Sequence, residues 1–363
     1  MSVALAATVP YAGHRLYEQR LAAALAPHTR VAYLEPPTAP RSLRAASRSG
    51  FLTDGGSTLV QPAWTLPFTR RLHLDRLREY AARRAATRAA AHLGGRASTV
   101  VYTDPTGALA AFPDAQRVLL IKDDYVAGAH LLGQDPADVE ARLRRAIAMA
   151  DAVVAVSPVL RDRLRRYDVE AEVIPAGCTL TAAPAEATPD RRRPLAAFLG
   201  GMSPRVLPGH LRAVLEAGCD LVMLGGLARN FPTGSQRTEL EAVLAHPRVL
   251  WRGHLSEPEV AEVLGGVDVG LVPYDASSFN AASFPLKTLE YLGAGVPVVS
   301  TPLPAIDWIG SEQIHVESEE HAFGAAAARV AGSLTPAVRQ ACRDVASGHT
   351  WEHRAQDWFK VLR

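Results

Sequence analysis

The sequence contains only three cysteines among 363 residues, Cys178, Cys219 and Cys342. They are odd in number, far apart and in no paired spacing, which excludes a disulfide framework and a cysteine-rich zinc site. The apolar start of the chain has no Lys or Arg before Arg15, so it lacks the basic region of a secretory signal. No stretch reaches the roughly 20 uninterrupted apolar residues that cross a bilayer. These absences favour a cytoplasmic protein.

Lysine is also scarce, with three residues (122, 287 and 360) against 36 arginines, although the formal net charge is only +2. The charge is uneven, because residues 41–96 hold eleven arginines and only three acidic residues, Asp54, Asp75 and Glu79. This region is either a solvated helix face or a docking surface for an anionic partner. Candidate partners are the inner membrane face, an acidic carrier protein or a phosphorylated acceptor. Few aromatic residues interrupt it, which argues against nucleic acid.

The length and the 48% hydrophobic content predict two globular domains. Short apolar runs alternate with helical patterns, as parallel sheets with crossover helices require. We therefore predict an α/β protein with two doubly wound, Rossmann-like domains facing a cleft. The expected strands are 2–8, 31–34, 99–102, 117–122 and 152–157, then 195–199, 221–224, 249–251, 269–272 and 296–300.

Proline, small residues and an arginine triplet interrupt this alternation before residue 195. We predict an N-terminal domain over 1–180, a linker over 181–194 and a C-terminal domain over 195–349. Residues 350–363 read as a capped helix with an apolar stripe. This helix either closes the second domain or crosses back to the first.

The segment 266–305 carries the clearest chemical signal. A strand over 269–272 is followed by a polar loop, 274–283, and by a helix that begins near Pro285 and ends at the glycines 293 and 295. The next strand starts at residue 296. A loop and a helix N-terminus therefore lie at the carboxyl edge of a parallel sheet, where open α/β folds bind ligands.

On this helix Lys287 and Glu290 share one face, beside an apolar arc that includes Leu286. The free N–H groups of the helix start suit a diphosphate, and a carboxylate can accept hydrogen bonds from two ribose hydroxyls. Such a pair is often only a solvated ion pair. The rarity of lysine in this chain favours a binding role, because an ammonium reaches phosphate differently from an arginine fork.

The stretch PLKTLEYLGAGVPVVST resembles the nucleotide-sugar motif of GT-B glycosyltransferases, in the GT4-like branch that includes bacterial exopolysaccharide glucuronosyltransferases. Weaker matches follow in the expected order: DDY at 123–125, ADAVVAVSPVLRDRL at 150–164, VIPAG at 173–177, FLGG at 198–201 and LWRGHL at 250–255. The resemblance implies transfer of a sugar, UDP-linked in our reading, to a glycan, lipid-linked, carrier-bound or natural-product acceptor. It also implies that the nucleotide sugar binds in the domain over 195–349 and the acceptor in the domain over 1–180, and that no metal and no other cofactor takes part.

This chain departs from the family pattern at one position. The family has two glutamates eight positions apart, and the second corresponds to Glu290, but the first falls on Ala282. The missing carboxylate is the one that commonly meets the transferred sugar. Two further hypotheses therefore stay open, a catalytically silent nucleotide-sugar-binding subunit and a UDP-sugar epimerase of similar fold.

Other candidate donor-binding residues follow strands of the second domain. Gly200 and Gly201 come before Arg205, so backbone could approach a phosphate while the guanidinium neutralises it. Gly225 has a similar position, and the resemblance places the backbone near Gly253 and His254 against the nucleobase. Glycine pairs of this kind also occur as simple turns.

The first domain offers candidates for a general base. Asp123 and Asp124 follow the strand 117–122, where they either cap the next segment or face an acceptor hydroxyl. Asp104 and His14 lie in loops on the same side. Adjacent carboxylates on an extended segment point apart, and there is no Asp-x-Asp motif, so we predict no metal site.

Overall fold

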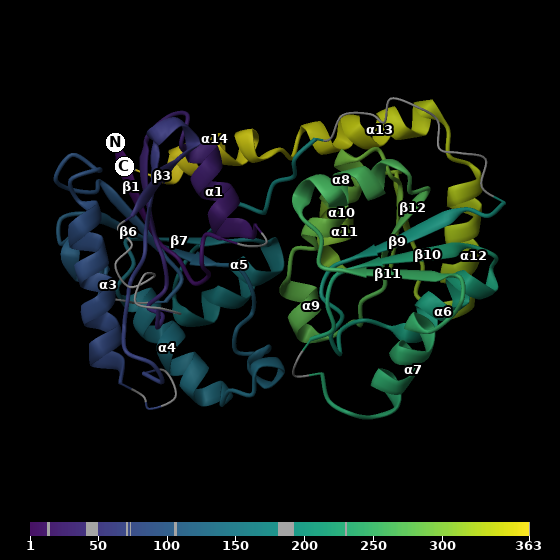
Figure 1. Cartoon of the computed structure of the whole chain (residues 1–363), viewed down its shortest axis with the longest axis horizontal. Coiled ribbons are helices and arrows are strands. Elements are labelled where there is room, and N and C mark those ends of the chain that lie inside the picture. The colour runs from purple at the N-terminus through teal and green to yellow at the C-terminus, as the bar shows by residue number, and fades with distance from the viewer. Residues whose placement is uncertain are drawn as a thin grey trace. The chain divides into compact units, whose positions relative to one another are not determined.

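The computed structural model describes residues 1–12, 15–40, 50–69, 72, 74–104, 107–180, 192–228 and 231–362. The chain forms two compact units. Unit 1 comprises Met1–Ala129, Gln134–Pro175 and Trp351–Arg363, and unit 2 comprises His130–Gly133 and Ala176–Thr350. Each unit has a sheet of largely parallel strands with helices on both faces (Figure 1).

Unit 1 contains an eight-stranded sheet in the order β3-β4-β2-β1-β5-β6-β7-β8. All pairs are parallel except β3 with β4. The strands are β1 (Ser2–Ala6), β2 (Arg30–Leu34), β3 (Phe51–Thr53), β4 (Thr58–Gln61), β5 (Thr99–Tyr102), β6 (Gln116–Ile121), β7 (Ala152–Ala155) and β8 (Glu172–Val173). The helices are α1 (Tyr17–Leu25), α3 (Asp75–Ala89), α4 (Pro136–Ala148), α5 (Pro158–Leu164) and α14 (Trp351–Val361). Short 3-10 turns of unit 1 are η1 (Asp54–Gly56), η2 (Leu109–Ala111) and η4 (Arg165–Tyr167), whereas η3 (Ala129–Leu132) belongs to unit 2 from His130 onward.

The terminal helix α14 belongs to unit 1, where it packs along α1. The Trp358 indole N–H donates to the Tyr17 hydroxyl at 3.1 Å, and that hydroxyl donates to the carbonyl of Ile174 at 3.0 Å. The Trp351 ring meets Tyr17 edge to face. The apolar stripe of α14 is thus buried against helix α1.

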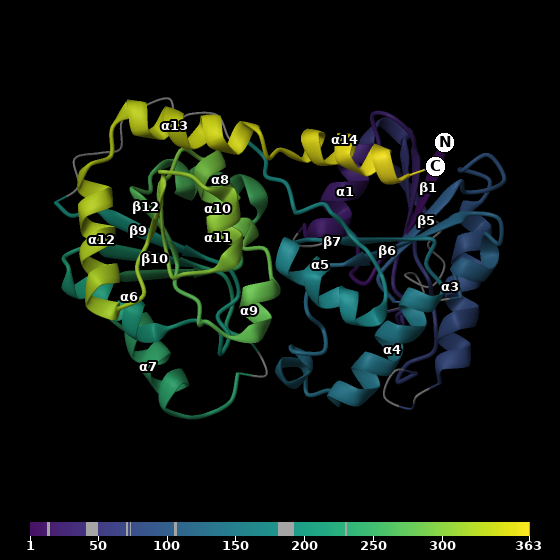
Figure 2. The same ribbon diagram turned by 180° about the vertical axis from the view of Figure 1, so that it is seen from behind.

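Unit 2 contains a fully parallel six-stranded sheet in the order β11-β10-β9-β12-β13-β14. The strands are β9 (Leu195–Leu199), β10 (Asp220–Leu224), β11 (Val249–Gly253), β12 (Val269–Val272), β13 (Val298–Ser300) and β14 (Ile314–Val316). The helices are α6 (Pro208–Glu216), α7 (Ser235–Leu244), α8 (Glu257–Gly265), α9 (Ser278–Ala282), α10 (Leu286–Gly293), α11 (Pro304–Ile309), α12 (Glu320–Gly332) and α13 (Pro336–Ser347). Helix α6 packs on α12, and α10 packs on α13, as both views show (Figures 1 and 2).

The predicted architecture of two doubly wound parallel sheets is confirmed, with some local differences. Strands β3, β4, β8 and β14 were not predicted, because they are short and carry little periodic pattern. The loop expected over 274–283 contains helix α9, whose first turn is capped by the Ser277 hydroxyl. None of the described helices is long and apolar enough to cross a membrane.

Candidate functional site

The reversal of strand order in the unit 2 sheet lies between β9 and β12. The chain runs outward from β9 through β10 to β11 and then returns to β12 on the other side of β9. At such a point the connections that leave the two adjacent strands, β9 to β10 and β12 to β13, go in opposite directions and open a crevice at the carboxyl ends of the strands. Residues 200–206 after β9 and 273–275 after β12 occupy this position.

Three glycines predicted to bind the donor lie together at this edge. The Gly200 amide donates to Leu224 at 2.8 Å, and the Gly225 amide donates to the carbonyl of Gly253 at 2.7 Å. Gly200 and Gly225 both have a φ of 135°, and a Cβ on Gly225 would overlap the Gly200 carbonyl. Only glycine permits this close packing of turns. A Cβ on Gly201 would meet no atom within 4 Å, so this turn is open on one side.

Lys287 reaches across from α10 to the end of β9. Its ammonium hydrogen-bonds the Tyr274 hydroxyl and lies 4.6 Å from the centroid of the Tyr274 ring and 5.3 Å from that of Phe198. A Cβ on Gly200 would overlap this ammonium. The structure thus brings Lys287 to the Gly200 turn, where aromatic faces stabilise its charge and no carboxylate of the described residues pairs with it.

Arg205 lies over the same tyrosine. Its guanidinium carbon is 5.5 Å from the Tyr274 ring centroid and 5.1 Å from that of Phe279, and it donates to the Asn280 side-chain oxygen at 3.3 Å. Asn280 is buried and is itself held by Asp275. Two cations therefore share one tyrosine at the switch point of the sheet.

Tyr291 fixes the helix that carries Lys287. Its hydroxyl accepts from the Leu199 amide at 2.6 Å and donates to the carbonyl of Ala197 at 2.9 Å, both in β9. Burial raises the pKa of Tyr291 well above its usual range, so the hydroxyl stays neutral. This anchor holds α10 against the strand whose end forms the glycine turn.

The start of α10 offers fewer free amides than the sequence suggests. Pro285 is buried and has no N–H, the Leu286 amide donates to Phe284, and the Thr288 amide donates to Pro285. The side-chain cations Lys287 and Arg205 are therefore a second source of positive potential at this edge. Glu290 follows Lys287 by three residues on the same helix and is half-buried.

The other predicted donor residue, His254, lies over the glycine turn that follows β10. A Cβ on Gly226 would overlap the imidazole of His254, and the exposed Trp251 indole donates to the carbonyl of Gly225 at 2.9 Å. Gly253, between them, has a φ of 62°. The structure therefore brings the predicted turns after β9, β10 and β11 to one edge.

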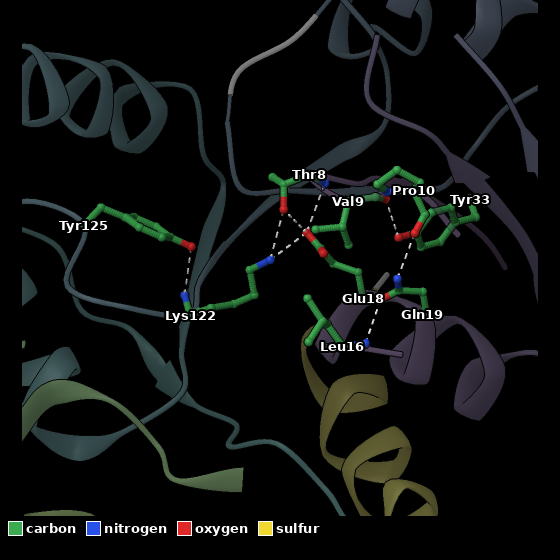
Figure 3. Close-up of polar contacts among 9 residues, drawn as sticks. All are labelled: Thr8, Val9, Pro10, Leu16, Glu18, Gln19, Tyr33, Lys122 and Tyr125. Atoms are coloured by element: carbon green, nitrogen blue, oxygen red, sulfur yellow. Dashed lines mark hydrogen bonds and ion pairs between the residues drawn. The ribbon is translucent and has the colours of Figure 1, made fainter. Parts of the chain in front are cut away.

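The corresponding edge of unit 1 is organised by a buried ion pair that the sequence analysis missed. The Lys122 ammonium, just after β6, lies 2.7 Å from a carboxylate oxygen of Glu18 on α1 (Figure 3). The same Glu18 oxygen accepts from the Thr8 hydroxyl at 2.8 Å and from the Thr8 amide at 3.2 Å. Glu18 is 4% exposed, and its second carboxylate oxygen has no hydrogen-bond partner within the described part of the chain.

The residues around this pair clamp the loop that follows β1. The Gln19 side chain donates to the carbonyl of Pro10 at 2.9 Å, and the Tyr33 hydroxyl donates to that of Val9 at 2.8 Å (Figure 3). Together with Glu18 these contacts attach successive loop residues to α1 and β2. The loop after β1 is therefore held in place by buried polar side chains.

The predicted general bases differ in their burial and in their contacts. Asp124 is buried, with one oxygen accepting from the Ala127 amide at 3.0 Å and the other 2.8 Å from Arg163, a geometry typical of a cap. Asp123 is half-buried and Asp104 is exposed. His14 lies outside the described residues.

Tyr125 contacts Lys122 and lies in the field of the nearby carboxylates. Its hydroxyl accepts from the Lys122 amide at 3.3 Å (Figure 3). Burial and then the charges of Asp123, Glu18 and Asp104 raise the pKa of Tyr125 well above its usual range. Three carboxylates thus act on one neutral phenol at this edge. Among the described residues no group of three or more potential ligands could hold a metal ion.

Comparison with known proteins shows what the segment that carries the unit 2 site is similar to. Residues 195–333 match the family described as Glycosyl transferases group 1. A Bacillus subtilis protein named as a teichuronic acid biosynthesis glycosyltransferase, TuaH, is 30% identical over 175 residues, which are 46% of this chain and 40% of that protein. This chain thus aligns with about two fifths of that relative.

Several solved structures match over 99% of this chain. Sucrose-phosphate synthase from Thermosynechococcus elongatus superposes with a TM-score of 0.73 at 18% identity, covering 99% of this chain and 98% of that one. Anabaena HepE, solved in complex with UDP and glucose, superposes with a TM-score of 0.67 at 14% identity. The match covers 99% of this chain and 98% of that one. These matches confirm the predicted fold of two doubly wound parallel sheets.

Proposed function

We propose that this chain, whose residues 195–333 match the group 1 glycosyltransferase family, transfers a sugar from a UDP-linked donor bound at the carboxyl edge of the unit 2 sheet. The observation that carries the proposal is the pair of cations, Lys287 and Arg205, on the ring of Tyr274. No ion pair joins either of them to a carboxylate in the part of the chain that the structure describes. Their positive charge is therefore available to an anionic ligand.

A nucleoside diphosphate fits this edge chemically. The open Gly200–Gly201 turn lets a phosphate approach the backbone, and Lys287 and Arg205 neutralise its charge from two sides. Glu290, one turn further along α10, accepts hydrogen bonds from the ribose hydroxyls, and Gly253 and His254 border the base. The complex of Anabaena HepE with UDP supports uridine as the base.

The acceptor binds at the carboxyl edge of unit 1 in this proposal. Transfer forms a bond between the acceptor oxygen and the anomeric carbon and breaks the bond from that carbon to the diphosphate. UDP leaves with its added charge stabilised by Lys287 and Arg205. If the reaction inverts the anomeric centre, the acceptor proton passes to a carboxylate, and Asp123 is the first candidate and Asp104 the second. If it retains the configuration, the leaving phosphate takes the proton.

A second hypothesis, a nucleotide-sugar-binding subunit without catalysis, is favoured by one observation. Ala282 is fully buried in α9, so the position of the first family glutamate holds a small apolar side chain. A sugar held there lacks that carboxylate contact. An epimerase of similar fold would use the same donor without releasing its nucleotide.

One experiment separates these hypotheses. The protein is first screened against UDP-sugars by thermal shift, because a ligand at 100 times its dissociation constant stabilises by about 2.7 kcal/mol. The best donor is then incubated with the protein, and free UDP and the sugar epimers are measured. We expect UDP release that increases with a saccharide acceptor. Binding without release would support the silent subunit, and epimerisation without release would support the epimerase.

A further inference from the structure

The surface of unit 1 around α3 combines exposed apolar side chains with arginines. Six large apolar residues between positions 66 and 80 are exposed, with Phe68 at 68%, Leu66 at 64% and Tyr80 at 63%. The others are Leu72, Leu74 and Leu77. So many exposed large apolar side chains in one short stretch are unusual on a surface that faces only water. A patch of this kind marks an interaction site.

These apolar residues lie together at the start of α3. The Leu72 amide donates to Phe68 at 2.9 Å and the Leu74 amide to Thr69 at 2.8 Å. Leu74 in turn accepts from the amides of Leu77 and Arg78. The segment before the helix thus passes through hydrogen-bonded turns directly into the first turn of α3. The exposed apolar side chains therefore all belong to one short stretch at the N-terminal end of this helix.

The outward face of α3 adds positive charge to this patch. The helix buries only alanines (81, 82, 85, 86 and 89). Arg76, Tyr80, Arg83 and Arg84 follow the spacing i, i+4, i+7, i+8 on the opposite side, where all four are exposed. Asp75 is paired with Arg78, whereas none of these three arginines has an ion-pair partner among the described residues. We name Leu66, Phe68, Leu72, Leu74, Leu77, Tyr80, Arg76, Arg83 and Arg84 the α3 patch.

We propose that the α3 patch docks the protein on an anionic lipid surface. Arginines bind lipid phosphates, while Leu and Phe enter the boundary between headgroups and acyl chains and Tyr lies at headgroup level. An acidic protein would satisfy the arginines. The run of exposed Leu and Phe beside them favours a lipid surface, because it matches the apolar side of an interfacial segment. The proposal does not depend on the donor site in unit 2.

Vesicle sedimentation with the full chain tests this. We expect binding to phosphatidylcholine vesicles that contain about a third phosphatidylglycerol and little binding to phosphatidylcholine alone. Raising the salt from about 0.1 M to about 1 M should release the protein, because screening shortens the range of the attraction. The double variant Arg83→Glu/Arg84→Glu should bind at least about 30-fold more weakly, from roughly fivefold per arginine.

Two further variants control for charge and for folding. Arg192→Glu/Arg193→Glu makes the same charge change at two neighbouring exposed arginines of unit 2 and should keep most of the binding. Phe68→Ser/Leu72→Ser leaves the charge unchanged and should weaken binding. All variants should keep the wild-type melting temperature, since the changed side chains are exposed. Equal binding to both vesicles, equal loss in the control variant, or binding to polyglutamate beads without binding to vesicles would overturn the proposal.

Discussion

The two sheet edges of this protein each hold a lysine, and the two lysines are used differently. Lys122 in unit 1 lies 2.7 Å from the buried carboxylate of Glu18, so its charge is compensated inside the unit. Lys287 in unit 2 rests on the rings of Tyr274 and Phe198, with no carboxylate paired to it in the described chain. The first lysine fixes a loop. The second leaves positive charge at the surface where we propose the diphosphate binds.

The largest expected effect concerns the carboxyl edge of the unit 1 sheet, where Glu18 compensates the charge of Lys122. If the reaction inverts and unit 1 supplies the base, Asp123→Asn should lower turnover by roughly 10²–10⁴-fold without changing the dissociation constant of UDP. UDP release with acceptor present measures the rate, and calorimetry measures UDP binding.

Asp124→Asn is the matched control for this test. It removes the buried ion pair with Arg163, so we expect a lower melting temperature but retained turnover in the folded fraction. Unchanged turnover in Asp123→Asn would shift the assignment to Asp104, or to a retaining reaction. Proton NMR of the anomeric coupling in the product distinguishes these two.

The next effect tests whether the Glu18–Lys122 pair is structural. Glu18→Gln keeps the shape of the side chain but leaves Lys122 without its counter-charge. Losing one partner of a buried pair costs about 3–5 kcal/mol, and we expect about 3 kcal/mol in urea unfolding because Lys122 is 18% exposed.

The double variant Glu18→Gln/Lys122→Met should recover most of this loss, because no uncompensated charge remains. Nucleotide binding at unit 2 should be unaffected in both variants. An equal loss of stability in the single and double variants would contradict the pairing as the cause.

Lys287 should show the opposite behaviour, a loss of activity without a loss of stability. Lys287→Met retains the apolar contact with the two rings but removes the charge beside the leaving diphosphate. We expect UDP release to fall roughly 10²–10³-fold. Lys360→Met is the natural control, since Lys360 is the third lysine of the chain and is exposed on α14. Similar rates for both variants would remove Lys287 from the proposed site.

Local sequence signals predicted the fold and much of the unit 2 edge. The strands 99–102, 195–199 and 269–272 match the structure at both ends, because apolar runs bounded by polar or glycine residues are local patterns. The glycine turns after β9 and β10 and the lysine of α10 could be predicted for the same reason. Parallel strands bring their carboxyl ends to one edge wherever they occur in the chain.

The unit 1 edge could not be predicted equally well, because its main contacts join residues far apart in sequence. Glu18 and Lys122 are separated by 104 positions, and a glutamate in the first turn of a helix is typical of a solvated residue. The scarcity of lysine was the one available signal. Likewise, no local pattern shows that Asp124 faces Arg163 or that Leu72 and Leu77 remain exposed.

The smallest expected effect concerns Glu290, which separates nucleoside recognition from charge at the unit 2 edge. If its carboxylate accepts hydrogen bonds from the ribose, Glu290→Ala should weaken UDP binding by about 1.5–3 kcal/mol, the range for hydrogen bonds to a charged group. Binding of inorganic diphosphate, which has no ribose, should not change, whereas Lys287→Met should weaken both ligands. Glu262→Ala, which removes an exposed glutamate of α8, is the matched control and should bind both normally. Calorimetry with UDP and with diphosphate measures these differences. Equal weakening of both ligands by Glu290→Ala would indicate that Glu290 acts on the phosphate region through Lys287 and does not contact the ribose.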